Sequence, residues 1–131
     1  AIVGGNLQKK IPHNEFLCTA KEYENFELRL QVKALGEGVN AGIQFRTKRI
    51  PNHHEVSGYQ ADVGGGWWGE LYDESRRPRI QLWLNGEQTV DYTEKEEGIA
   101  RKGIIAVQIH GGPPSEAWYR DIVIKELPAS E

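Results

Sequence analysis

The chain has 131 residues, 38% of them hydrophobic and 27% charged, which is enough for one domain around one core. Charges of both signs are interspersed and the formal net charge is -3, so no basic stripe is present to neutralise the phosphates of a nucleic acid. No hydrophobic run is long enough to cross a bilayer. We therefore expect no nucleic-acid partner and no membrane span, while the oligomeric state stays open.

The only cysteine, Cys18, excludes an internal disulfide framework and a zinc cluster built from cysteines. Because it follows Phe16 and Leu17, we expect a buried, inert thiol.

Apolar and polar residues alternate along most of the chain, and helical periodicity is almost absent. Residues 1–5 read as the middle of a strand, so we expect the opening strand to be cut before Ala1. The clearest strand is 26–33, which turns Phe26, Leu28, Leu30 and Val32 to one face. The other expected strands are 41–46, 59–63, 70–73, 79–84, 88–92, 103–110 and 118–127. The inward sets of two of them are Ala41, Ile43 and Phe45 on 41–46, and Ile105, Val107 and Ile109 on 103–110.

Turn signals separate these strands. Asn85-Gly86 is the strongest short hairpin signal, and Arg120-Asp121 breaks the alternation of the last strand, where we expect a bulge or an edge. Short strands between turns rich in glycine and proline predict an all-β fold, a two-sheet antiparallel sandwich.

Residues that hydrogen-bond or titrate occupy the outward positions of three expected strands, where Lys, Glu and Thr are usual. They are Gln44, Arg46, Gln60, Asp62, Gln108 and His110. Sugars are bound by planar polar groups and by aromatic rings, and Trp67, Trp68 and Tyr72 supply rings beside the glycines of 64–66. The pattern predicts a polar, sugar-sized cleft on one sheet.

Each of these residues also has a purely structural explanation. Arg46 and Asp62 can form a cross-strand ion pair, which contributes about 0.2–1 kcal/mol. His110 can be an ordinary histidine at a strand end, and Trp67-Trp68 can plug the core. Their gathering on one face favours a ligand site.

Other kinds of site find little support. The chain has no nucleophile elbow and no phosphate-binding loop between a strand and a helix. His53-His54-Glu55 has the residue types of metal ligands, but neighbours on an extended chain point in opposite directions. Asp73-Glu74 offers carboxylates for a hard cation or for acid–base chemistry, and solvated charges are an equal alternative.

Residues 40–46, Asn-Ala-Gly-Ile-Gln-Phe-Arg, resemble the Asn-Ser-Gly-Ile-x-x-Arg signature of the 3-keto-disaccharide hydrolase family. Five further runs resemble segments of that family in the same order, namely 58–62, 68–77, 83–86 with 90–92, 103–110 and 119–122. The resemblance implies a concanavalin-like jelly roll, an active cleft on the concave sheet, and action on glycosides whose C3 hydroxyl is oxidised to a ketone. It also implies a periplasmic or secreted location.

A C3 ketone acidifies the proton on C2, so that a base can remove it and the C1 substituent can leave. Water then adds, which gives net hydrolysis. His110 is the candidate base, because an imidazole exchanges its proton near neutrality. The candidate electrophile is Arg46, or a divalent cation held by Asp62 or Asp73. Gln44, Gln60, Gln108, Trp68, Tyr72 and Asp73 are the candidate substrate-binding residues.

The family has a further loop and strand where this chain joins Arg77 directly to Pro78. We expect a single jelly-roll domain over 1–131 with a segment missing at this junction; a true deletion would instead open the sheet edge. Because fold does not fix function, the alternative to the enzyme is a non-catalytic, lectin-like carbohydrate-binding module of an exported protein, and a structural domain is a third reading.

Overall fold

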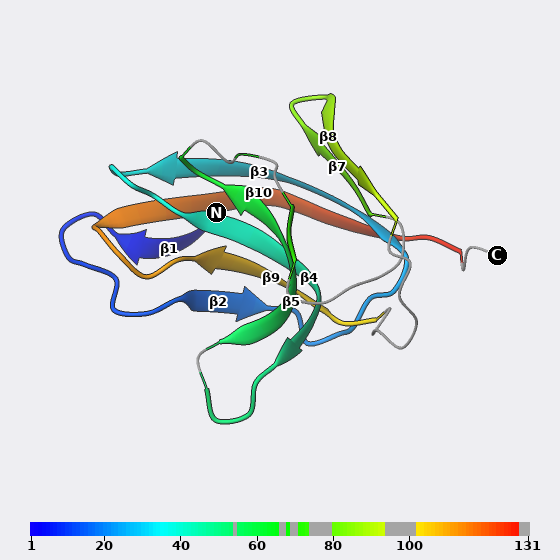
Figure 1. The fold of residues 1–131 in the computed structure, drawn as a ribbon, viewed down its shortest axis with the longest axis horizontal. Helices are drawn as coiled ribbons and strands as arrows, with labels where there is room; N and C mark the ends of the chain where they lie inside the picture. Colours follow the sequence, from blue (N-terminus) through cyan, green and yellow to red (C-terminus); the bar gives the residue numbers. More distant parts are fainter. Residues whose placement is uncertain (54, 66–67, 69–70, 74–79, 94–101, 129–131) are drawn as a thin grey trace.

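The computed structural model describes residues 1–53, 55–65, 68, 71–73, 80–93 and 102–128. Within these ranges the chain forms strands and no helix (Figure 1). The strands are β1 (Ile2–Asn6), β2 (Glu15–Cys18), β3 (Phe26–Leu35), β4 (Ala41–Arg49), β5 (Val56–Val63), β6 (Leu71–Asp73), β7 (Ile80–Leu84), β8 (Glu87–Tyr92), β9 (Ile104–Ile109) and β10 (Ser115–Glu126).

The strands form two facing antiparallel sheets and one separate hairpin. One sheet has the order β1-β10-β3, and the other has the order β2-β9-β4-β5-β6. The hairpin β7-β8 projects away from the sandwich (Figure 1). This arrangement confirms the all-β, two-sheet antiparallel sandwich predicted from the alternation, and it is consistent with the jelly roll that the resemblance implies.

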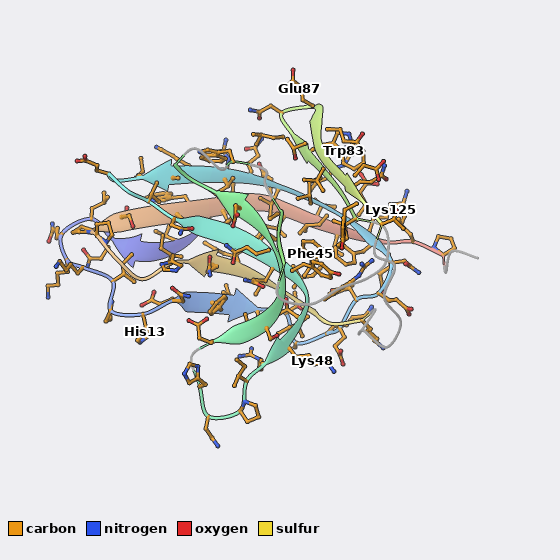
Figure 2. The ribbon with its side chains drawn as sticks, viewed as in Figure 1. His13, Phe45, Lys48, Trp83, Glu87 and Lys125 are labelled. Carbon is orange, nitrogen blue, oxygen red and sulfur yellow. The ribbon has the colours of Figure 1, made fainter. Side chains whose placement is uncertain are left out.

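The core between the sheets consists of two clusters of buried side chains. One gathers around Ile109 and Tyr119, with Leu30 and Val32 of β3 packed against it. The other contains Phe45, whose ring stacks on that of Tyr59 with the centroids 5.5 Å apart. Figure 2 shows Phe45 near the middle of the molecule and Trp83 on the projecting hairpin. The residues expected inward on β3, β4 and β9 therefore do face the core.

Two local predictions about the backbone are confirmed. Asn85 and Gly86 both have positive φ, 50° and 84°, as the two-residue turn between β7 and β8 requires. The pairing of β10 with β3 shifts between Arg120 and Val123, where Asp121 has a φ of 53°, so of the bulge or edge expected there the bulge is present.

The strand β2 was not predicted. It has only four residues and pairs with β9 at the edge of the five-stranded sheet, with Leu17 57% exposed. Phe16, Leu17 and Cys18 are all apolar, so this segment lacks the alternation that predicts a strand. No helix in the described part of the chain is long and apolar enough to cross a membrane.

Candidate functional site

The central strands of the five-stranded sheet bring four of the predicted polar residues together. The register sets Gln44 of β4 opposite Gln60 of β5, and Gly42 opposite both Asp62 of β5 and Gln108 of β9. The intervening residues of each strand face the core, so alternation places these side chains on the other face. We call Gln44, Gln60, Asp62 and Gln108 the polar layer.

The polar layer is buried, which corrects the expectation of side chains open to solvent. Gln44, Gln60 and Gln108 are only 6%, 7% and 4% exposed, whereas Asp62 is half-buried. Alternation gives the face that a side chain occupies but not its exposure, and buried amides must find hydrogen-bond partners.

A directed chain of hydrogen bonds supplies those partners. The Nε2 of Gln44 donates to the Oε1 of Gln60 at 2.5 Å, and the Nε2 of Gln60 donates to Oδ1 of Asp62 at 2.8 Å. The hydroxyl of Thr47 lies 3.4 Å from the Oε1 of Gln44. This series of hydrogen bonds ends on the carboxylate of Asp62, which only accepts. The orientation of both glutamine amides follows from this.

Gly42 leaves space for the side chain of Gln60 in this series of hydrogen bonds. A Cβ at this position would lie 2.7 Å from Cγ, Cδ and Nε2 of Gln60, a distance that real Cβ atoms essentially never show. The side chain of Gln60 therefore lies across the glycine, between the positions of Asp62 and Gln108. This close packing explains why a glycine is needed in the middle of a central strand.

Arg46 is displaced from the strict alternation that predicted its place. The pairing of β4 with β5 shifts between Phe45 and Lys48, and Arg46 has a φ of 48° within this bulge. Thr47, paired with Ile104, takes the next position of the polar face, and it is 1% exposed. Arg46 is 8% exposed, so it is a buried cation beside the polar layer.

Thr47 was missed because the predicted strand ended at Arg46, and the sequence carries no signal for a bulge there. Asn40 belongs to the run that resembles the family signature, but it is not among the predicted site residues. Its carbonyl accepts the backbone N–H of His110 at 2.8 Å, which extends the ladder between β4 and β9 by one residue.

His110 directly follows β9 and is exposed. Continued alternation from Gln108 places it on the polar side of the sheet. Its Nδ1 lies 2.6 Å from the carbonyl oxygen of Gly111. Because a carbonyl oxygen only accepts, Nδ1 carries the hydrogen, and the neutral ring then has its lone pair on Nε2.

His110 and Arg46 lie at opposite ends of the polar layer. His110 is next to Asn40, which directly precedes β4, and Arg46 lies six positions after Asn40. At about 3.3 Å per residue, this is a separation of about 20 Å along the strand. Asp62 and Gln108 both pair with Gly42, which is two positions after Asn40. They are therefore closer to His110 than Arg46 is.

The backbone register separates the two residues predicted on β6. Tyr72 pairs with Gln60 of the polar layer, whereas Asp73 pairs with Tyr59, which is fully buried in the core. The structure therefore brings Tyr72, and not Asp73, opposite the polar layer.

The ring of Trp68 is half-buried and packs against the core cluster around Ile109, as the structural explanation requires. Trp67, His54, Glu74 and the junction of Arg77 with Pro78 lie outside the described residues.

The thiol of Cys18 is half-buried in the strand next to β9. Burial raises its pKa, and the nearby charge of Arg49 opposes this shift. Where the structure describes side chains, no group of three or more His, Cys, Asp or Glu residues could hold a metal ion. The divalent cation considered for Asp62 or Asp73 therefore stays a prediction.

The model of one protein family matches this chain, the 3-keto-alpha-glucoside-1,2-lyase-like domain, over residues 1–79 and 74–125. The two matched stretches overlap at residues 74–79, which include the junction of Arg77 with Pro78. No curated protein and no solved structure matches the chain. Because the matched stretches cover nearly the whole length, the chain belongs to the family of 3-keto-alpha-glucoside-1,2-lyase-like domains.

Proposed function

We propose that this protein cleaves 3-keto-glycosides by removing the C2 proton and eliminating the C1 substituent, with addition of water completing a net hydrolysis. The family description supports the substrate class. The observation that carries the reaction is the Nδ1 contact of His110 with the carbonyl of Gly111, which leaves Nε2 as a proton acceptor at the end of the polar layer.

In the proposed reaction, Nε2 of His110 takes the proton from C2, and the electron pair of the C–H bond moves toward the C3 carbonyl as an enolate. The pair then forms the C1–C2 double bond as the C1–O bond breaks. The departing alkoxide takes up a proton and leaves as an alcohol. Water adding across the double bond, its hydroxyl to C1 and its hydrogen to C2, gives the free 3-keto sugar.

The enolate oxygen needs hydrogen-bond donors that are already in place. We propose Gln60 for this role, because its Nε2 has two hydrogens and uses one of them on Asp62. The carboxylate of Asp62 fixes the direction of the amide. Tyr72, whose backbone pairs with Gln60, is the proposed aromatic contact to the sugar.

We assign Arg46 to the far end of the substrate. The backbones of Arg46 and His110 are about 20 Å apart along β4, a separation that suits a ligand with more than one ring. Arg46 would then bind the sugar or aglycone beyond the bond that breaks.

The variant His110→Asn tests the function. We expect it to abolish turnover of 4-nitrophenyl 3-keto-α-glucoside while binding of the same compound persists, because an amide cannot accept the C2 proton. His53→Asn, which removes another exposed imidazole, is the matched control and should keep full turnover. Turnover by His110→Asn at the parent rate would exclude His110 as the base.

The same experiment separates the enzyme from the carbohydrate-binding module. A parent protein that binds the compound, and also unoxidised methyl α-glucoside, but turns neither over would be a module.

We also propose that the protein works outside the cytoplasm, in the periplasm or after secretion. Fractionation of cells that express the complete chain would test this location.

A further inference from the structure

We propose that the Oε1 of Gln108 accepts a hydrogen bond from one hydroxyl of the bound sugar, and that this contact selects substrates that keep that hydroxyl. The proposal rests on the proposed function to the extent that the ligand is a 3-keto-glycoside. It gives Gln108 a different task from Gln44 and Gln60.

The three buried glutamines of the polar layer differ in one respect. Gln44 and Gln60 use their side chains on each other and on Asp62. The Oε1 of Gln108 is equally buried, but it has no hydrogen-bond partner among the described residues. Buried acceptors without a partner are rare and destabilise a fold, so this atom needs an explanation.

The position of Gln108 is fixed from three sides. It lies in the middle of the sheet, with Phe16 opposite it on β2 and Gly42 opposite it on β4. From the core side, the hydroxyl of Tyr119 donates to its backbone carbonyl at 2.6 Å. Because the backbone cannot move easily, the buried, unpaired acceptor is held in place before any ligand arrives, which lowers the entropic cost of binding.

An acceptor needs a donor from the ligand. The C3 ketone of a 3-keto-glycoside has no hydrogen to donate, whereas the hydroxyls at C2, C4 and C6 each do. Gln108 lies two residues from His110 on the same face, so the hydroxyl it binds belongs to the ring that reacts. Sites that bind a substrate hydroxyl reject the analogue without it by a factor of about 10⁴ or more in favourable cases.

The variant Gln108→Met provides the first test, because methionine has a similar volume and no strong acceptor. We expect its Tm to equal or exceed that of the parent, since an unpaired buried polar group is removed. Its affinity for methyl 3-keto-α-glucoside, measured by calorimetry, should fall about tenfold or more. Gln31→Met, on the other sheet at an exposed position, is the matched control and should bind like the parent.

The 2-deoxy, 4-deoxy and 6-deoxy analogues of methyl 3-keto-α-glucoside provide the second test. One of them should bind the parent much more weakly than the full sugar does, and Gln108→Met should bind that analogue and the full sugar almost equally. The proposal is overturned if Gln108→Met has a lower Tm and unchanged affinity, which would mean that the amide serves the fold through a bound water. It is also overturned if every deoxy analogue binds Gln108→Met with the same loss of affinity, relative to the full sugar, as it shows with the parent.

Failure of this inference can be told apart from failure of the proposed function. Binding of the sugar without turnover in the parent would reject the reaction, while the deoxy series would still decide the role of Gln108. Turnover in the parent with no selective effect of Gln108→Met would reject the inference alone. A parent that binds none of these sugars would reject both.

Discussion

Single residues of the polar layer differ in whether their hydrogen bonds are made inside the protein. Gln44 and Gln60 are bonded in a fixed direction that ends on Asp62. His110 is exposed at one end, and Arg46 is buried at the other. These differences give each residue a separate expected phenotype.

Replacing Arg46 tests whether it acts far from the reacting carbon. We expect Arg46→Met to raise KM for a 3-keto-disaccharide about tenfold or more, because a charge-assisted hydrogen bond to the substrate is lost, and to lower kcat much less than His110→Asn does. Arg46→Lys should recover part of the affinity. A fall in kcat as large as that of His110→Asn, with KM unchanged, would place Arg46 at the reacting centre instead.

Cys18 is expected to react slowly, because burial raises the pKa of its thiol and only the thiolate is nucleophilic. At pH 8, alkylation of the folded protein by iodoacetamide should be slower than alkylation of the chain unfolded in urea, as followed by mass spectrometry. Equal or faster alkylation of the folded protein would show that the nearby charge of Arg49 outweighs burial.

At the scale of the strand, β4 organises the site. Its central glycine, Gly42, leaves space for the side chain of Gln60. Its bulge changes which residue follows Gln44 on the polar face. The bulge therefore brings Thr47 into hydrogen-bond range of Gln44.

Gly42→Ala tests this arrangement. The added methyl group would meet Gln60 at 2.7 Å, so we expect Gln60 to move, its bond to Asp62 to break, and the protein to lose about 1–3 kcal/mol of stability in urea unfolding. Gln60→Ala removes the obstacle, so the double variant should lose less than the sum of the single changes. Additive losses would mean that Gly42 matters for another reason.

At the scale of the whole molecule, Tyr119 connects the two sheets at the site. It lies on β10, and its hydroxyl donates to the carbonyls of Gly42 on β4 and Gln108 on β9, at 3.2 and 2.6 Å. The side chain is 2% exposed, and burial raises the pKa of Tyr119 well above its usual range. The polar layer is thus supported from the core by a hydroxyl that stays protonated.

Tyr119→Phe should lower the free energy of unfolding by about 1–3 kcal/mol at neutral pH, because two buried carbonyls lose a donor. The raised pKa means that the folded state keeps a proton that the unfolded chain releases above about pH 10. The parent should therefore lose stability as the pH rises beyond that point, and Tyr119→Phe should lose less. Parallel stability curves for the two proteins between pH 9 and pH 11 (about one unit either side of this point) would contradict the expectation.

The sequence by itself determined the all-β sandwich, the inward sets of β3, β4 and β9, the hairpin turn at Asn85-Gly86 and the bulge near Asp121. These features follow from alternation and from local backbone preferences, both of which depend only on residues close together in the sequence. It also determined that Gln44, Gln60, Asp62 and Gln108 share a face, since the period of a strand is two.

Only the tertiary structure decided which of these side chains are bonded to each other, how deeply they are buried, and where β4 bulges. The hydrogen bond between Gln44 and Gln60 joins residues 16 positions apart, and the bulge depends on its fit with two neighbouring strands. Whether the buried Oε1 of Gln108 has a hydrogen-bond partner is decided by residues distant in sequence, so its unpaired state is visible only in the folded structure.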